Sequence, residues 1–126
     1  MTHNLYKENI IDHYKNPKNF GKINKPTKTL IGNNPLCGDR IKIQLVIKNK
    51  IIKDIKFTGE GCAISISSTS MFTEYIKGKN LAQLSKLNKS FMEKLIGVKI
   101  SIGRIECLLL PLKTLKGILI DETKRS

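Results

Sequence analysis

Apolar and polar positions alternate through the middle of this chain. Residues 41–48 read IKIQLVIK, in which isoleucine or leucine occupies every second position and lysine, glutamine or valine falls between. That period of two is typical of a strand with one buried face. Asn49 then makes a tight turn, and residues 51–58, IIKDIKFT, return as the second arm of a hairpin. Residues 27–32 predict a further short strand.

Helical patterns lie on both sides of this hairpin. Residues 4–15 predict a helix that ends before a loop with two prolines. Beyond the hairpin, Cys62 opens a long helical pattern, which closes at Gly78. Two shorter helices are predicted next, the first capped by Asn80 and the second by Ser90.

The C-terminal region combines an extended segment with a final helix. Residues 98–106 predict extended chain, and Cys107 begins the helix. Pro111 lies four residues further on, where its ring would clash with the carbonyl of Cys107. We therefore expect the helix to begin near Leu110 or to be kinked. Several strands followed by several helices, without a repeat or a linker, predict one α+β domain over residues 1–126.

The charge of the chain suggests nucleic-acid binding, but its composition argues against it. The formal net charge is +13, and the 23 basic residues comprise 20 lysines and 3 arginines. Proteins that read bases and phosphates rely on the planar fork of arginine. The lysines are also spread along the chain, together with 19 isoleucines and 10 asparagines, which indicates a compositional bias. We predict no nucleic-acid partner and keep a small basic nucleic-acid-binding zinc domain as an alternative.

Hydropathy indicates where the protein works. No apolar run approaches the roughly 18 residues that a membrane span needs, and residues 1–10 lack the charged and apolar regions of a signal peptide. We therefore predict a cytoplasmic protein with no membrane partner. In that compartment, an odd set of three cysteines indicates metal binding or catalysis more often than disulfides.

The three cysteines all lie at predicted junctions between elements. Cys37 is in a Gly/Pro loop before a strand, and Cys62 and Cys107 stand at helix starts, where free N–H groups lower the pKa of a thiol. Each could instead be a small buried apolar residue. No CxxC pair supports a metal site by spacing alone.

A zinc site becomes possible if the three thiolates converge. Tetrahedral zinc needs four ligands, and Asp39 is the natural fourth because Gly38 bends the loop between Cys37 and Asp39. Asp39 could equally form an Asx-turn. Such a site would be negative and would favour nearby cations, for which Arg40 and Arg104 are candidates, although either could be a solvated surface charge.

Longer blocks of sequence around these residues resemble a known family. The blocks NNPLCGDRIKIQL, GEGCAISISSTSMFTEYIKGK and GVKISIGRIECLLLPLKTL, with IIDHYKNPKNFG before them, are similar to the IscU/NifU N-terminal family of iron–sulfur cluster assembly proteins. The match covers nearly the whole chain in order. The GEGCAIS helix entry and the RIEC block look closest to the SufU branch.

The resemblance implies a fold and a set of site residues. It implies a three-stranded antiparallel sheet with helices packed on it and a metal site at one exposed end. Carried over by position, Cys37, Asp39, Cys62 and Cys107 would be the metal ligands. Cys37 would be the persulfide acceptor, freed from zinc when a ligand of the partner replaces it. Arg104 matches a basic position that helps to organise the site or the partner contact.

The resemblance also implies a reaction and partners. SufU-like proteins bind zinc, take persulfide sulfur from a PLP-dependent, SufS-like cysteine desulfurase and pass it on to cluster assembly or sulfur-accepting proteins. Whether such a chain counts as an enzyme, a sulfurtransferase acting with its desulfurase, stays open. IscU-like proteins instead assemble a transient [2Fe–2S] cluster on the same ligands, so iron is the alternative metal.

Three features separate the two branches. Glu106 stands where the IscU branch has a histidine, and a carboxylate there could itself reach the metal. Residues 95–99 lack the double proline by which the IscU branch recruits its chaperone, whereas the segment between Cys62 and Cys107 has a length close to that branch. We predict a zinc-binding sulfur acceptor, with a cluster scaffold and a purely structural zinc site as alternatives.

Overall fold

The computed structural model describes the backbone of residues 2–125 and the side chains of residues 7–119. Five α-helices, three strands and one 3₁₀ turn follow one another through this part of the chain. Their bounds are α1 (Thr2–Lys15), β1 (Lys28–Asn34), β2 (Asp39–Lys48), β3 (Ile51–Glu60), α2 (Ala63–Ile76), α3 (Leu81–Ser85), α4 (Lys89–Ile96), η1 (Ile102–Arg104) and α5 (Ile105–Arg125).

The strands form one antiparallel sheet in the order β1-β2-β3, which confirms the predicted α+β fold and its three-stranded sheet. The alternation in β2 is confirmed as well, because Ile41, Ile43 and Leu45 are fully buried. Asn49 and Lys50 connect β2 to β3 with positive φ angles of 53° and 62°. A two-residue turn with both φ angles positive suits the twist of a hairpin.

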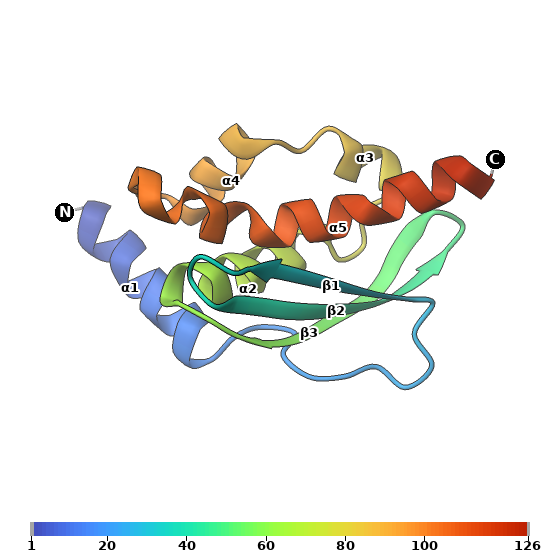
Figure 1. Ribbon diagram of the computed structural model, residues 1–126, viewed down its shortest axis with the longest axis horizontal. Helices are drawn as coiled ribbons and strands as arrows, with labels where there is room; N and C mark the ends of the chain where they lie inside the picture. The colour runs from blue at the N-terminus through green and yellow to red at the C-terminus, as the bar shows by residue number, and fades with distance from the viewer. Residues whose placement is uncertain (1, 126) are drawn as a thin grey trace.

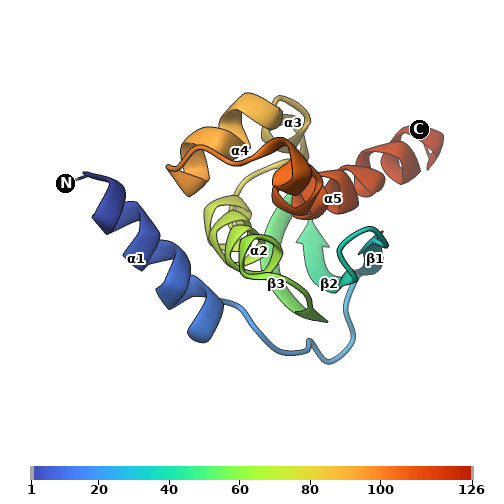
Figure 2. The same cartoon turned by 60° about the vertical axis from the view of Figure 1, so that its left-hand side comes forward.

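Helices α2 and α5 cover one face of the sheet, and the loop of residues 16–27 crosses the other face (Figures 1 and 2). The loop adds to the outer edge of β3, where the backbone N–H of Gly21 donates to the carbonyl of Phe57 at 2.8 Å. The core therefore lies between the sheet and the helices. Its largest fully buried side chains are Phe57, Phe72, Ile41, Ile43, Leu45, Ile52, Ile55, Ile76, Leu84, Met92, Ile96 and Leu108.

The predicted starts of the middle helices are confirmed in two cases of three. Cys62 is the N-cap residue of α2, and Asn80 caps α3 with a reciprocal capping box to Gln83. The prediction of Ser90 as the next cap is wrong, since the Asn88 side chain accepts the N–H of Phe91 at 3.0 Å. Asn88 lies two residues before Ser90 and offers the same kind of side-chain acceptor, so the helix begins two residues earlier than predicted.

The predicted start of the last helix near Leu110 is also wrong, and the alternative, a kink, stays a prediction. Extended chain ends at Ser101, η1 follows, and α5 begins at Ile105, five residues before the expected Leu110. Pro111 lies inside α5, where it cannot donate a hydrogen bond to the carbonyl of Cys107. Burial of an apolar stripe of α5 offsets that loss. As a result, Cys107 lies within the first turn of the helix.

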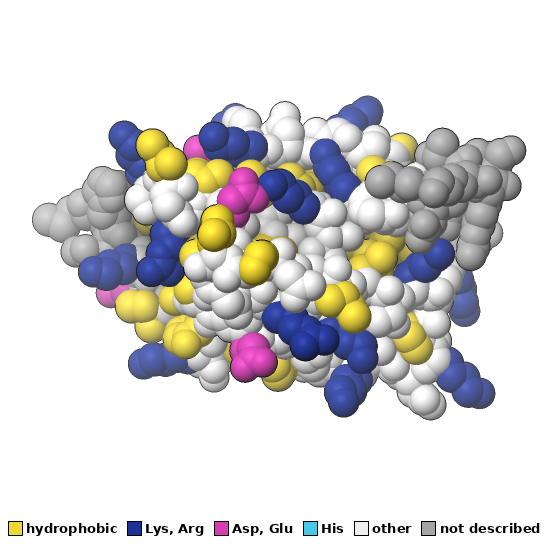
Figure 3. Space-filling model, viewed as in Figure 1, with side chains coloured by type: hydrophobic (Ala, Val, Ile, Leu, Met, Phe, Trp, Pro, Cys, Tyr) yellow, Lys and Arg dark blue, Asp and Glu magenta, His cyan; other side chains and the backbone are white. Residues whose placement is uncertain are grey.

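Figure 3 shows lysine and arginine side chains distributed over one face of the molecule, among apolar and polar neighbours. Within the described residues, no helix combines the length and the apolar character that a membrane span requires.

Candidate metal centre

The turn between β1 and β2 carries the first thiol. The backbone N–H of Cys37 donates to the carbonyl of Asn34 at 3.2 Å and closes a four-residue turn. Asparagine in the first position and Pro35 in the second are typical of such a turn. Gly38 follows with φ +71°, a conformation that favours glycine. Cys37 is therefore exposed at the tip of a tightly bent loop.

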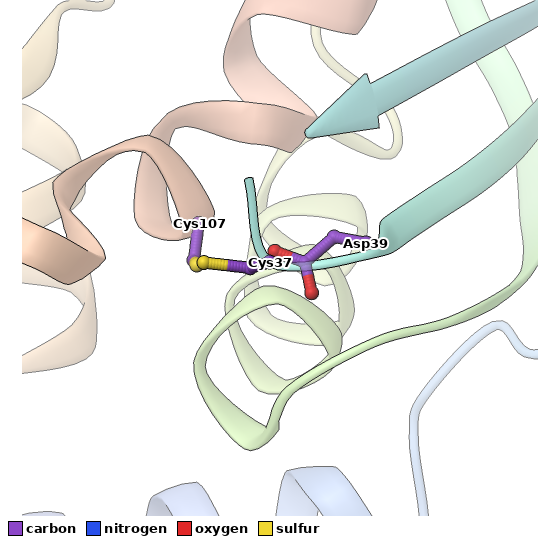
Figure 4. A group of neighbouring side chains, drawn as sticks. All are labelled: Cys37, Asp39 and Cys107. Atoms are coloured by element: carbon purple, nitrogen blue, oxygen red, sulfur yellow. The ribbon is translucent and has the colours of Figure 1, made fainter. Parts of the chain in front are cut away.

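Two further groups from separate elements meet this thiol. Asp39 is the first residue of β2, and Cys107 belongs to the first turn of α5. The ligand atoms of Cys37, Asp39 and Cys107 all lie within 4.8 Å of one another. Figure 4 shows the two sulfur atoms pointing toward each other with the carboxylate beside them. The structure thus brings together residues that are 70 positions apart in the chain.

Cys62 reaches the same cluster through Asp39. Its Sγ lies 3.9 Å from Asp39 Oδ2, and its backbone N–H donates to Oδ1 at 2.9 Å. Cys62 is partly buried and is the N-cap residue of α2, so this helix begins at the cluster. Cys62 lies outside the group of three whose atoms are all within 4.8 Å, but it contacts the carboxylate of that group.

The surroundings of Asp39 favour its charged form. Burial raises the pKa of this carboxyl, but the N–H of Cys62 and hydrogen bonds from Cys107, Ser65 and Asn34 outweigh burial, and the net pKa is lowered. These bonds join Asp39 to other elements, unlike an Asx-turn, which is local to its own loop. An ionised carboxylate is therefore held at the centre of the cluster.

The surroundings of Cys107, in contrast, favour its neutral form. Burial raises the pKa of its thiol, and the neighbouring Asp39, Cys37 and Cys62 raise it further. A second negative charge beside Asp39 is unfavourable at low dielectric unless a cation lies between the two groups. Without a bound cation, the cluster thus holds Cys107 as a thiol.

Arg104 supplies one positive charge at the rim. Its pKa is raised by a hydrogen bond to Cys62 and by the charges of Cys62, Cys107 and Cys37. The guanidinium is exposed on η1, directly before α5. Arg104 therefore lies beside the cysteines, and its role in the site or in a partner contact stays a prediction.

Two other predicted neighbours lie elsewhere. Arg40 is exposed, whereas the preceding residue, Asp39, is buried, so the two side chains point to opposite faces of β2. Glu106 pairs with Lys113 along the exposed side of α5 and lines a groove of about 320 Å³ between that helix and β1. Its carboxylate does not belong to the cluster of ligand atoms.

The donor set consists of ligand types that zinc accepts. It comprises three sulfur atoms and one carboxylate oxygen, and four donors complete a tetrahedron. A tetrahedron with Zn–S bonds of roughly 2.3 Å separates its sulfur atoms by about 3.8 Å. The ligand atoms of Cys37, Asp39 and Cys107 lie within 4.8 Å of one another, and Cys62 Sγ lies 3.9 Å from Asp39 Oδ2, so three donors are near that spacing and Cys62 has to move closer to complete the tetrahedron. The residues present therefore fit a zinc ion.

Asn34 is a site residue that the sequence analysis missed. Its buried side chain donates to Asp39 Oδ2 at 3.3 Å and to Cys107 Sγ at 3.5 Å. One signal was available: Asn33 and Asn34 precede a proline turn, and strand alternation must direct one of the two inward.

Together, these features define a small α+β protein with a candidate metal–thiolate site at the end of its sheet. The chain belongs to the family of the NifU-like N-terminal domain, whose model matches residues 5–120. This match confirms the resemblance that the sequence blocks indicated.

The chain is similar to named relatives from both the SufU and the IscU branches of the family. The chain is 43% identical over 108 residues to the zinc-dependent sulfurtransferase SufU of Bacillus subtilis, which covers 82% of this chain and 73% of the relative. It is 37% identical over 93 residues to the iron–sulfur cluster assembly scaffold protein IscU 1 of Archaeoglobus fulgidus, covering 74% and 61% of the two chains. A solved structure of a putative iron–sulfur cluster assembly scaffold protein for the SUF system, from Fervidobacterium islandicum, superposes with a TM-score of 0.75. Its sequence identity is 32%, with coverage of 92% of this chain and 97% of the other.

Proposed function

We propose that this chain is a zinc-binding sulfur acceptor. It receives persulfide sulfur from a PLP-dependent cysteine desulfurase and passes it on for iron–sulfur cluster assembly. The similarity to the zinc-dependent sulfurtransferase of Bacillus subtilis supports the class of reaction. The proposed metal ligands are Cys37, Asp39, Cys62 and Cys107, and Cys37 is the proposed acceptor.

One observation carries this proposal, namely the unequal exposure of the thiols. Cys107 is completely buried, and Asp39 is 2% exposed, whereas Cys37 is exposed at the loop tip. A purely structural zinc site would be closed and would need its ligands only for folding. An exposed ligand next to buried ones supports a site that exchanges sulfur with a partner.

The chemistry of the step is thiol exchange. Zinc, when bound, would keep its cysteine ligands deprotonated without adding redox chemistry. The thiolate of Cys37 attacks the outer sulfur of a persulfide on the desulfurase. A new S–S bond forms at Cys37, the S–S bond on the desulfurase breaks, and its cysteine leaves as a thiolate. The transfer is redox-neutral and needs no further reactant.

The residues around Cys37 can assist this exchange. The cation of Arg104 lies beside the thiols and would stabilise negative charge on the attacking sulfur. Leu36, 90% exposed next to Cys37, gives a partner an apolar contact directly at the acceptor. Access therefore favours Cys37 over the partly buried Cys62 and the buried Cys107.

A second candidate function is a scaffold that assembles a [2Fe–2S] cluster on the same residues. The naming of the Archaeoglobus fulgidus relative and of the Fervidobacterium islandicum structure as scaffolds favours it. The cluster would then be the cargo of the site. Thiolates bind iron as well as zinc, so the donor set is compatible with both candidates.

Metal and sulfide analysis of protein purified without oxygen separates the two. The sulfur-acceptor proposal expects about one zinc per chain, no labile sulfide and no visible absorption. Iron with a matching amount of sulfide, together with visible absorption bands, would contradict it in favour of the scaffold. Stimulation of a purified SufS-like desulfurase by the zinc-loaded protein then tests the partner directly.

A further inference from the structure

Asn34 contacts three of the four proposed ligands. Its side-chain Nδ2 donates to Asp39 Oδ2 at 3.3 Å and to Cys107 Sγ at 3.5 Å. Its backbone carbonyl accepts the N–H of Cys37 at 3.2 Å. The side chain is 7% exposed and Asn34 pairs with Asp39 across the sheet. A single residue at the end of β1 therefore connects the strand, the loop and α5.

The chemistry of the amide suits this position. An amide nitrogen carries two N–H donors and no charge, and both bonds here go to acceptors that bear negative charge in a metal-bound site. The reversed amide would place its oxygen against a carboxylate and a sulfur, which is repulsive, so the partners determine its orientation. A buried polar group with partners fixes the position of those partners in return.

The side-chain and the backbone hydrogen bonds of Asn34 restrain different parts of the proposed ligands. The side chain of Asn34 holds the ligand atoms of Asp39 and Cys107 themselves. Asn34 holds Cys37 only through the backbone, so it does not restrain the sulfur, which lies at the exposed loop tip. The same residue thus restrains two ligand atoms and does not restrain the third.

We propose that Asn34 is the positioning residue of this centre, which fixes Asp39 and Cys107 as permanent ligands and leaves Cys37 as the ligand that is released. This role rests on the proposed zinc site. It extends that proposal, because the side chain of Asn34 would then determine which ligands remain on the metal and which ligand is released. Hydrogen bonds from outside the ligand shell orient ligands and commonly change metal affinity about 10–100-fold.

Three variants and one control test this role. Asn34→Ala and Asn34→Leu both remove the donor, and the leucine also keeps the volume, so a cavity alone cannot explain a shared effect. Asn34→Ser is the third variant, because its hydroxyl retains one donor. Asn33→Ala is the matched control, since Asn33 is exposed on the opposite face of the same strand. Each protein is first melted without metal to compare folding.

Zinc affinity is then measured by chelator competition, and the ligand set is read from the absorption spectrum of the cobalt-substituted protein. We expect Asn34→Ala and Asn34→Leu to bind zinc about 10–100-fold more weakly than wild type, with a shifted sulfur-to-cobalt band and at unchanged folding. Asn33→Ala should match wild type, and Asn34→Ser should fall between. Equal zinc affinity and equal cobalt spectra in all variants would overturn the role.

A second readout addresses which ligand leaves. The zinc-loaded proteins are treated with limiting iodoacetamide, and the labelled cysteine is identified by peptide mass spectrometry. Wild type should be labelled at Cys37, and loss of the Asn34 donor should increase labelling of Cys107 relative to Cys37. An unchanged ratio would contradict the assignment of permanent and leaving ligands. Wild-type protein that binds zinc but takes no sulfur would refute the proposed function, while the zinc comparison would still decide the role of Asn34.

Discussion

The two sides of the cysteine cluster are built differently. On the inner side, an added Cβ at Gly61 would lie 2.5 Å from Asp39 Oδ1, so the carboxylate is packed directly against the backbone. On the outer side, an added Cβ at Gly38 would meet nothing within 4 Å. Both glycines adjoin a proposed ligand, yet one is required by packing and the other by backbone conformation.

This difference shows how one site can hold a metal and still exchange sulfur. The inner side supplies fixed ligands through hydrogen bonds and close packing, which reduce the reorganisation needed when a metal binds. The outer side supplies a thiol whose surroundings leave room for a partner. We therefore expect substitutions on the inner side to change metal affinity and stability, and substitutions on the outer side to change sulfur transfer.

Cys37→Ser should have the largest effect on function and should leave the inner side intact. We expect it to abolish stimulation of the desulfurase, because serine cannot form a persulfide. The free energy of unfolding of the zinc-free protein should change by no more than about 0.5 kcal/mol, since the side chain is exposed. Full retention of desulfurase stimulation would refute the acceptor assignment.

Asp39→Ala should weaken zinc binding and stability on the inner side of the cluster. It removes a ligand, and the zinc-binding free energy should fall by a fraction of the roughly 10–16 kcal/mol typical of structural zinc sites. It also leaves the N–H of Cys62 without its acceptor, which should destabilise the zinc-free protein by about 1–3 kcal/mol. Chelator competition and denaturant unfolding measure the two effects.

The control for this variant is Asp54→Ala, which removes an aspartate of the same sheet that pairs with Lys77 away from the cluster. Zinc affinity should be unchanged there. If Asp39→Ala binds zinc as tightly as this control, Asp39 is not a ligand.

Gly61→Ala and Gly38→Ala compare the two sides directly. The new methyl group at Gly61 should displace Asp39, lower zinc affinity and cost about 1–3 kcal/mol of stability through overpacking. At Gly38, where φ is +71°, alanine should cost roughly 1–2 kcal/mol through backbone strain alone and leave the position of Asp39 unchanged. Equal zinc affinity in the two variants would contradict the proposed difference between the sides.

Glu106→Gln should have the smallest effect. Glu106 pairs with Lys113 on the exposed side of α5, so its loss should cost at most about 0.2–1 kcal/mol of stability. Zinc affinity should stay at the wild-type level, as in the control Glu93→Gln on α4. A clear loss of zinc affinity in Glu106→Gln alone would show that this carboxylate reaches the metal after all.

The hairpin of the sheet was predictable because its signal is local. Period-two alternation over residues 41–48 and a turn at Asn49 depend only on neighbouring positions, and the structure places β2 and β3 there. The start of the last helix was not predictable from the sequence. Pro111 is locally unfavourable in a helix, whereas the burial of α5 against the sheet is a property of the whole fold.

The site was predictable in its chemistry but not in its connections. Residue types and family resemblance pointed to Cys37, Asp39, Cys62 and Cys107, and the structure brings three of these close together, with Cys62 in contact with Asp39. The contribution of Asn34 depends on strand register and on where α5 begins, and no local pattern contains either. For the same reason, the sequence could not show that Glu106 faces Lys113 and not the cluster.

We propose that sulfur arrives at Cys37 and at no other thiol. The zinc-loaded protein is incubated with a purified SufS-like cysteine desulfurase and cysteine, alkylated, and digested for peptide mass spectrometry. We predict one additional sulfur atom on the peptide that contains Cys37, while the peptides of Cys62 and Cys107 carry no additional sulfur. A persulfide on Cys62 or Cys107, or on none of the three, would contradict the account.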